Sequence, residues 1–357
     1  MAIHQLLAGF MPGDAISNYA LELRKIFRGW GEDSRIFVAS GGLDPRAASR
    51  AEPLGEHRRH SGPGNILVYH FSIGSSATDY FRTVPDTKVI IYHNITPARY
   101  FALVRPELAE MLDRGRRELF QLAPVTDLAL GVSEYNRREL EAAGFARTGT
   151  VPLTVDWSSL EEKPDRSVLF RHRRGRNNLL FVGRLVPNKK LEDLLKVFYY
   201  YKPIKPAAKL FLVGNHQGEE QYLEFLRSVI QELGLKDVVF SGHVSHAQLL
   251  AYYQLAGAYL CLSEHEGFCL PLMEAMRFRI PVLAYAAAAV PDTLDGAGVL
   301  IREKNFPEIA EMAALLQDDP VLRRRIVEEQ DRRLERFRSL PLDSALRALL
   351  RPSASLT

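Results

Sequence analysis

One junction between a strand and a helix constrains the fold of this chain more than any other part of its sequence. Residues 258–262 form an apolar run typical of a buried strand, and residues 272–276 have the pattern of a helix. Pro271 suits the first turn of that helix. The spacing therefore places Glu266 at the carboxyl end of a strand and Glu274 about one turn into the following helix.

Such a junction is a common ligand site in an open α/β sheet, and a helix N-terminus offers free N–H groups to an anion. A nucleotide sugar would suit it, because its phosphate meets the N–H groups and its hydroxyls meet the carboxylates of Glu266 and Glu274. The alternative is a helix N-terminus that carries acidic residues only because the helix dipole favours them.

A second loop in the same half of the chain favours the nucleotide sugar. Residues 179–195 combine an apolar strand, a glycine turn and an amphipathic helix. Arg184 and Lys189 lie in the turn, where a planar guanidinium and a compact ammonium could hold a diphosphate. A solvated basic loop is the alternative for this segment alone.

Both segments resemble the retaining glycosyltransferases of family 4, which have the GT-B fold. The resemblance is carried by the run Val-Gly-Arg-Leu-Val-Pro-Asn-Lys at 182–189 and by the Glu-x7-Glu pair at 266 and 274. Weaker matches follow along nearly the whole chain, at 92–94, 132–134, 151–156, 212–214 and 242–244. The combination is specific to the superfamily but not to a donor sugar or an acceptor.

The resemblance implies an α/β chain with two Rossmann-like domains facing a central cleft and a last helix that crosses back to the N-terminal domain. We expect an acceptor-binding domain at residues 1–160, joined by a helix at about 340–357, and a nucleotide-sugar-binding domain at 161–339. The polar, arginine-rich stretch 157–178 is interpreted as the linker between them. The chain length and its 46% hydrophobic content are sufficient for two cores.

Alternating strand and helix patterns in both halves predict parallel sheets. The expected strands of the first half lie at 3–10, 35–39, 66–71, 89–92, 129–133 and 150–153. Those of the second half begin near residues 179, 209, 238, 258, 281 and 299.

The resemblance also assigns roles to the donor loops. Arg184 and Lys189 would hold the donor diphosphate and stabilise the charge that grows on it as the glycosidic bond breaks. Lys190 stands where a glycine often follows the lysine in related sequences, which leaves the choice between Lys189 and Lys190 open. Gly183 and Gly214 fall in the matching donor segments.

Further donor contacts are implied around the paired glutamates. Glu274 would accept hydrogen bonds from the ribose, and Glu266 would face hydroxyls of the transferred sugar near the reacting carbon. The following residues would present main-chain N–H groups to the sugar or phosphate: Gly267, Phe268, Cys269 and Leu270. His243 and Val244 match the segment that meets the nucleobase, although His243 could equally be a surface or packing histidine.

The first half contributes fewer candidates. His93 ends the strand at 89–92 and matches a histidine that contacts the donor sugar, so it joins Glu266, Arg184 and Lys189 as a catalytic candidate. Local hydrogen bonding is the alternative for His93. Gly13 and Asp14 lie in an acceptor-side loop that departs from the family's frequent double glycine, so Asp14 either helps to position the acceptor or only caps the next helix.

Composition limits the other classes of function. A net charge of +3 gives a weak field and does not indicate a nucleic-acid binder. The basic clusters at 114–117 and 171–176 could face anionic lipid or a lipid-diphosphate acceptor, whereas 323–325 is interpreted as solvated. Two cysteines make neither a disulfide framework nor a zinc site and fit a reducing cytoplasm. Without a signal peptide or a spanning run, the chain is expected to be cytoplasmic, with possible peripheral contact at the inner membrane face.

The leading hypothesis is a retaining glycosyltransferase that moves a hexose from a nucleotide-diphosphate sugar, such as a UDP- or GDP-hexose, to a hydroxyl of a glycan or glycolipid with an α linkage. Neither a metal nor a cofactor is expected, because arginine and lysine would neutralise the diphosphate and no Asp-x-Asp triplet is present. The alternatives are a non-catalytic nucleotide-sugar-binding subunit and an enzyme of the same fold with epimerase-like or phosphorylase chemistry.

Overall fold

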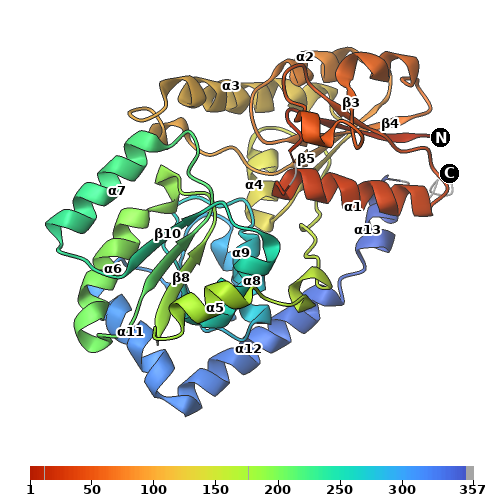
Figure 1. Cartoon of the computed structure of the whole chain (residues 1–357). Helices are drawn as coiled ribbons and strands as arrows, with labels where there is room; N and C mark the ends of the chain where they lie inside the picture. The colour runs from red at the N-terminus through yellow and green to blue at the C-terminus, as the bar shows by residue number, and fades with distance from the viewer. Residues whose placement is uncertain (12, 176, 351–357) are drawn as a thin grey trace. The chain divides into compact units, whose positions relative to one another are not determined.

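The computed structural model describes residues 1–11, 13–175 and 177–350. The chain divides into two compact units (Figure 1): an N-terminal unit, Met1–Thr154 with the segment that begins at Pro341, and a C-terminal unit, Val155–Leu340. The division falls a few residues before the expected boundary at 160 and 161. Pro12 of the expected acceptor-side loop and Arg176 of the basic cluster at 171–176 lie outside the described residues.

The N-terminal unit is built on a seven-stranded sheet in the order β3-β2-β1-β4-β5-β6-β7, and every pairing within it is parallel. Its strands are β1 (Ile3–Leu7), β2 (Ile36–Val38), β3 (Glu52–Pro53), β4 (Ile66–Phe71), β5 (Thr87–Tyr92), β6 (Leu128–Gly131) and β7 (Thr148–Thr150). Its helices are α1 (Ala15–Gly29), α2 (Ser76–Thr83), α3 (Pro106–Leu122), α4 (Glu134–Ala142) and α13 (Leu342–Leu350).

The C-terminal unit has a six-stranded parallel sheet in the order β10-β9-β8-β11-β12-β13. Its strands are β8 (Asn178–Val182), β9 (Leu210–Val213), β10 (Val238–Gly242), β11 (Ala256–Cys261), β12 (Val282–Tyr285) and β13 (Val299–Ile301). Its helices are α5 (Arg166–His172), α6 (Leu191–Ile204), α7 (Glu220–Glu232), α8 (His246–Leu255), α9 (Leu270–Arg277), α10 (Val290–Leu294), α11 (Phe306–Asp318) and α12 (Pro320–Arg338).

Both sheets have the strand order of a doubly wound Rossmann-like domain. The order reverses between β1 and β4 in one unit and between β8 and β11 in the other. Ligands bind outside the carboxyl ends of the strands at such a reversal, because the flanking loops leave in opposite directions there. The fold therefore directs attention to the loops that follow β8 and β11.

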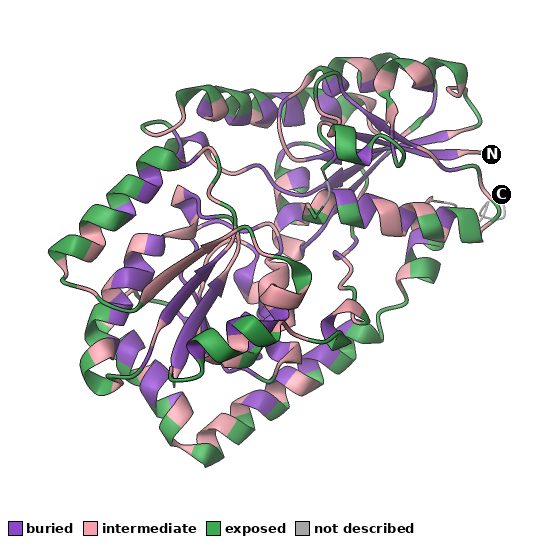
Figure 2. Cartoon of the chain, in the orientation of Figure 1, coloured by how far each residue is buried: buried purple, intermediate pink, exposed green. Residues whose placement is uncertain are grey.

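The central strands are buried on both faces, as the continuous apolar runs in the sequence predict. Leu179, Leu210 and Leu260, on β8, β9 and β11, have no exposed surface. Figure 2 shows these strands buried, whereas the edge strand β10 is only partly buried along its length. Apolar side chains of α6 and α11 complete the core of the C-terminal unit.

Two expectations about secondary structure are wrong. The stretch 157–178 is not a linker, because α5 forms within it, in the C-terminal unit. Asp165 caps α5 by accepting from the main-chain N–H of Ser167 at 2.7 Å, and Val168 is buried. The strand expected at 150–153 instead ends at Thr150, since Pro152 has no N–H to donate to a sheet ladder.

The last helix belongs to the N-terminal unit, which confirms that the chain crosses back after α12. Trp30 Nε1 donates to the Asp343 carboxylate at 2.8 Å, and the Arg347 guanidinium lies 5.3 Å from the centre of the Trp30 ring. Leu346 is buried. Among the described residues, no helix is long and apolar enough to cross a membrane.

The approach of β8 and β9 at their carboxyl ends leads to a first prediction. A Cβ on Gly214 would lie 1.8 Å from the Gly183 carbonyl oxygen, so Gly214→Ala should force the two loops apart. We expect it to lower the free energy of unfolding by about 2 kcal/mol or more beyond Gly234→Ala, which pays only for a left-handed backbone in open space. Urea unfolding of both variants checks this, and equal losses would contradict the steric account.

Candidate functional site

The loops after β8 and β11 are fastened to each other by main-chain and amide hydrogen bonds. Asn188 Nδ2 donates to the His265 carbonyl at 3.0 Å, and the Glu264 N–H donates to the Asn188 carbonyl at 2.9 Å. Asn188 lies in a short 3-10 helix, Pro187–Lys189, that follows β8. These two hydrogen bonds of Asn188 hold Lys189 beside the loop that contains Glu266.

An ion pair between Lys189 and Glu266 forms the centre of the site. The Lys189 ammonium donates to Glu266 Oε2 at 2.6 Å, and the two side chains are only 18% and 8% exposed. Burial acts to lower the pKa of Lys189, but the charge of Glu266, its hydrogen bond and the nearby sulfurs of Cys269 and Cys261 together raise the pKa above its usual value. Lys189 is therefore a fixed cation at the reversal between β8 and β11.

The backbone separates the roles of the two neighbouring lysines. Lys190 has a left-handed conformation, with φ of 53°, and caps the start of α6. Its ammonium turns away to Glu192 at 3.3 Å and Glu264 at 3.8 Å. Of the two lysines that the sequence left open, the structure brings Lys189 to Glu266.

Arg184 follows Gly183 at the end of β8 and remains apart from the ion pair. Its guanidinium is 59% exposed and contacts the Glu219 carboxylate at 3.5 Å. A single contact of this length between an exposed arginine and a carboxylate contributes little to stability. The arginine is thus held loosely near the carboxyl edge, where it can reach an anion at small cost.

The loop from Glu266 to Leu270 is anchored through its carbonyl groups. The Ala289 N–H donates to the Glu266 carbonyl at 3.2 Å, and the Thr293 hydroxyl donates to the Phe268 carbonyl. Cys269 has a left-handed backbone, with φ of 73°, and leads into α9. Within the described ranges, the structure records no acceptor for the main-chain N–H groups of residues 267–270, which lie at the positive end of the helix dipole.

Glu274 lies on α9 beside a tyrosine that the sequence did not single out. The Tyr253 hydroxyl donates to Glu274 Oε2 at 2.6 Å, and the Tyr253 ring stacks on Phe278 with centroids 5.0 Å apart. Burial raises the pKa of the Glu274 carboxyl. Tyr253 thereby fixes one carboxylate oxygen and leaves the other for a second donor.

A thiol pair also adjoins the ion pair. Cys261, Cys269 and Glu266 offer ligand atoms within 4.8 Å of one another. A hydrogen bond with Cys261 and burial raise the pKa of Cys269. Because Lys189 already holds Glu266, the trio is a weak candidate for a metal. Counting thiols alone did not reveal this cluster, which depends on the loop bringing Cys269 back to β11.

The nucleobase candidates lie at the carboxyl end of the edge strand β10. His243 is exposed and Val244 is half-buried. Both precede α8, whose start is fixed by a capping box between Ser245 and Gln248. Gly214 directly follows β9 and Gly183 directly follows β8, so these candidates follow one edge of the sheet from β10 to β11.

In the N-terminal unit, His93 belongs to a buried hydrogen-bonded chain. His93 Nε2 lies 2.9 Å from His70 Nδ1, and His70 Nε2 lies 2.9 Å from Gln5 Oε1. The Gln5 amide nitrogen donates to the Ala20 carbonyl at 3.0 Å, which orients the amide. Burial lowers the pKa of His70 to about 3 and that of His93 well below its usual range, so both rings are neutral.

The direction of these hydrogen bonds determines the tautomers. Because the Gln5 oxygen accepts, His70 donates from Nε2 and accepts at Nδ1. His93 must then donate from Nε2, which leaves its Nδ1 as an acceptor, and in the described structure that atom is buried without a partner. His93 can therefore accept a hydrogen bond from a hydroxyl.

The acceptor-side loop is less distinctive. Asp14 caps α1 by accepting from the main-chain N–H of Ser17 at 2.9 Å and from its hydroxyl at 3.0 Å. Gly13 has φ of 81° and open space around its α-carbon. The structure thus gives Asp14 a capping role, and a role in positioning the acceptor stays a prediction.

Comparison with known proteins shows what the segment around this site is similar to. Residues 166–333 match the family model described as glycosyl transferases group 1. A GDP-mannose-dependent monoacylated alpha-(1-6)-phosphatidylinositol monomannoside mannosyltransferase from Corynebacterium glutamicum is 24% identical, over 60% of this chain and 58% of that enzyme. A GDP-mannose:cellobiosyl-diphosphopolyprenol alpha-mannosyltransferase from Xanthomonas campestris is 32% identical, over 39% of this chain and 37% of that enzyme. The match covers less than two thirds of either relative.

Solved structures of other proteins have a similar fold over nearly the whole length of this chain. Sucrose-phosphate synthase from Thermosynechococcus elongatus has a TM-score of 0.77 at 17% identity, covering 98% of both chains. Anabaena HepE in complex with UDP-glucose has a TM-score of 0.75 at 18% identity, covering 98% of this chain and 99% of that one. The chain has the GT-B fold, and residues 166–333 of its C-terminal unit match the glycosyl transferases group 1 family.

Proposed function

We propose that this protein is a retaining glycosyltransferase that moves a hexose from a nucleotide-diphosphate sugar to a hydroxyl of a glycan or glycolipid, with an α linkage. The observation that carries the proposal is the Lys189–Glu266 ion pair at the reversal between β8 and β11, next to the free N–H groups at the start of α9. A cation, a carboxylate and unpaired N–H groups at one strand edge suit a ligand that has both phosphates and sugar hydroxyls.

The names of the curated relatives favour a GDP-hexose, with GDP-mannose the first donor to test. UDP-glucose is the second, because a neighbour of the same fold was solved with it. The lipid-linked acceptors named for the relatives support a glycolipid acceptor and peripheral work at the inner membrane face from the cytoplasm. These substrates are part of the proposal for this chain.

In the proposed reaction, the bond between the anomeric carbon and the donor phosphate oxygen breaks while the acceptor oxygen bonds to the same face of that carbon. The departing phosphate takes the acceptor proton. Arg184 would leave Glu219 for the diphosphate, and Lys189 would share its charge between Glu266 and the phosphate. These two cations would stabilise the growing charge without a metal ion, the largest catalytic contribution that such sites usually make.

The remaining contacts orient the donor. Glu266 would accept hydrogen bonds from hydroxyls of the transferred sugar, and Glu274, fixed by Tyr253, would accept from the ribose. Residues 267–270 would donate main-chain N–H groups to the phosphate or sugar. The strand edge that ends in His243 and Val244 would meet the nucleobase.

His93 would contribute from the N-terminal unit. Its buried Nδ1 is an acceptor without a partner in the described structure, which suits a donor-sugar hydroxyl. Gly13 and Asp14 would line the acceptor side. A non-catalytic nucleotide-sugar-binding subunit is the competing proposal, and turnover distinguishes the two because both would bind the nucleotide.

Replacing Arg184 tests the diphosphate contact. Arg184→Ala should reduce turnover by about 10²–10³-fold, because a cation that stabilises the leaving group is lost. The fold should persist, since the side chain is exposed and the one ion pair that the structure records for it among the described residues is the 3.5 Å contact with Glu219. A coupled assay of released nucleoside diphosphate, with GDP-mannose and UDP-glucose as donors, measures this turnover.

Arg332→Ala is the matched control, because Arg332 is also an exposed arginine of the C-terminal unit paired with a single glutamate. It should keep wild-type turnover. Unchanged turnover in Arg184→Ala would remove the assigned role. Nucleotide binding without turnover by the wild-type protein, with any donor and a lipid-linked acceptor, would favour the binding subunit.

Glu274 should show opposite effects on stability and binding. Because burial raises the pKa of Glu274, its ionised form is less stable in the folded chain than in the unfolded one. Glu274→Gln should therefore raise the free energy of unfolding at pH 7 by roughly 0.5–2 kcal/mol, the range common for single stabilising substitutions. The same variant should weaken binding of the nucleotide through its ribose.

The pH dependence of this gain in unfolding free energy tests whether ionised Glu274 destabilises the folded chain. The gain should be fully present above the folded-state pKa and vanish below the ordinary value of 4.5, where the wild-type carboxyl is neutral in both states. Urea unfolding at pH 7 and pH 4 and calorimetric titration with GDP and UDP measure the two effects. Undiminished nucleotide affinity would show that the ribose does not meet Glu274.

A further inference from the structure

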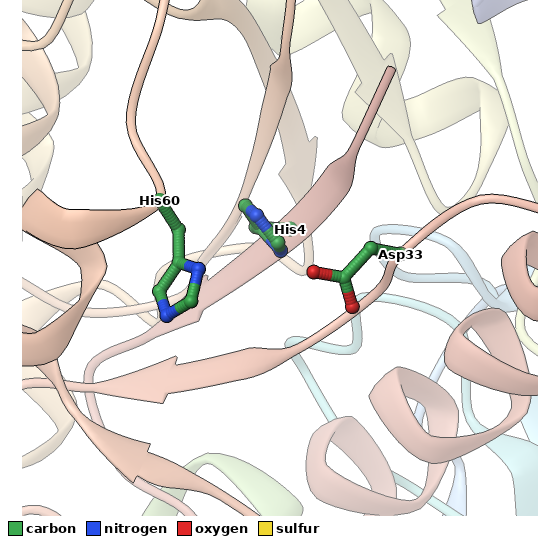
Figure 3. Close-up of side chains that lie close together, drawn as sticks. All are labelled: His4, Asp33 and His60. Carbon is green, nitrogen blue, oxygen red and sulfur yellow. The ribbon is translucent and has the colours of Figure 1, made fainter.

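Three side chains of types that can bind a metal meet at the amino edge of the N-terminal sheet, opposite the carboxyl edge at which His93 lies. His4 is the second residue of β1, Asp33 precedes β2, and His60 directly follows the 3-10 helix Leu54–Arg59. One ring nitrogen of each histidine and one carboxylate oxygen of Asp33 all lie within 4.8 Å of one another. Figure 3 shows the His60 ring and the Asp33 carboxylate on either side of His4.

The histidine at the centre of this cluster lacks the partner that a buried polar group requires. His4 is 1% exposed, and across the described residues its Nδ1 has no hydrogen-bond partner. Leaving a buried polar atom unpaired usually destabilises a protein, so such an atom calls for an explanation. Two more buried atoms without a hydrogen-bond partner in the described residues, His57 Nε2 and Asp86 Oδ1, lie 3.8 Å apart near the same edge.

The backbones of the three residues are positioned by main-chain and amide hydrogen bonds. The Ile3 N–H donates to the Asp33 carbonyl at 2.9 Å, which aligns the two segments beside His4. Asn65 Nδ2 donates to the His60 carbonyl at 2.8 Å, while its Oδ1 accepts from the Ala2 N–H at 2.9 Å. The three ligands therefore come from segments already tied to one another.

We propose that His4, Asp33 and His60 bind a divalent transition-metal ion of the zinc class. Zinc bonds of about 2.0–2.2 Å set the ligand atoms roughly 3.4 Å apart in a tetrahedron. The cluster thus has to close by about an ångström, and rotation of Asp33, whose side chain is 51% exposed, and of the half-buried His60 supplies this movement. The buried His4 ring provides the fixed point.

The donor set selects the class of ion. Two imidazoles and one carboxylate suit zinc, cobalt, nickel or iron, whereas magnesium and calcium prefer all-oxygen sites. The Arg35 guanidinium reaches Asp33 Oδ2 at 3.4 Å, a weak surface pair that leaves the other carboxylate oxygen available. Solvent would complete the coordination at the exposed side.

The ion would act as a structural clamp. It would join the start of β1 to the segments that lead into β2 and β4, the two neighbours of β1 in the N-terminal sheet. This inference does not depend on the proposed glycosyl transfer, because the cluster belongs to the N-terminal unit and the donor loops belong to the C-terminal unit.

The test is zinc binding by the full chain, prepared without a histidine tag and freed of metal by dialysis against a chelator. Calorimetric titration with zinc chloride should give one ion per chain, and saturating zinc should raise the melting temperature by about 3 °C or more. His60→Ala and Asp33→Asn, both outside the core, should weaken zinc binding at least tenfold, since the loss of even an outer-shell partner costs about 10–100-fold.

His246→Ala, which removes an exposed imidazole of the C-terminal unit, is the control and should bind zinc as the wild type does. Substituting cobalt gives a second readout, because thiolate ligands add strong near-ultraviolet absorption that nitrogen and oxygen ligands lack. The proposal would be overturned if the wild type did not bind zinc, or if Asp33→Asn and His60→Ala bound zinc as tightly as the wild type. A cobalt spectrum with thiolate bands from Cys261 and Cys269 would overturn it as well.

Discussion

The ion pair between Lys189 and Glu266 is the constraint on which the loops at the carboxyl edge of the C-terminal sheet depend. Withdrawing both charges from water costs several kcal/mol per ion, and their attraction offsets this only at close, well-oriented contact. The 2.6 Å separation meets that requirement. It is maintained by the hydrogen bonds of Asn188 between the loops and by the hydrogen bond from the Ala289 N–H to the Glu266 carbonyl.

The same loops hold backbone strain that only a rigid frame would maintain. Lys190 and Cys269 are non-glycine residues in the left-handed region, each at a cost of about 1–2 kcal/mol. Lys190 lies immediately before α6 and Cys269 immediately before α9, so each turn aims a helix start at the edge where β8 and β11 diverge. Strain that clusters in this way is typical of sites shaped for a ligand rather than for stability.

Sequence reasoning succeeded where local pattern decides the structure and failed where chain-distant residues meet. The buried strands and the start of α9, with Pro271 in its first turn, follow from apolar runs and helix-start signals. The short helix α5 escaped because its apolar residues, 168–170, are consecutive and not at helical spacing, and only Val168 of them is buried. The choice of Lys189 over Lys190 required the left-handed turn, which no composition rule indicates.

The histidines of the N-terminal sheet also meet only in the fold, and they form two groups, one near each edge of the sheet. Gln5 and His70 lie on β1 and β4, and His93 directly follows β5. The parallel register sets their polar side chains in one hydrogen-bonded chain near the carboxyl ends. His4 stands one residue before Gln5, so it points to the opposite face of the sheet. It meets His60 and Asp33 near the amino ends instead.

One strand therefore supplies both an orienting group for the proposed chemistry and the fixed member of a candidate metal clamp. A change at one edge can leave the other intact only if β1 keeps its register, because a slip of one residue would exchange the environments of His4 and Gln5. Parallel pairing of β1 with β2 on one side and with β4 on the other guards against that slip. A metal ion at the amino edge would add to this restraint on the very strand from which the chain of hydrogen bonds to His93 begins.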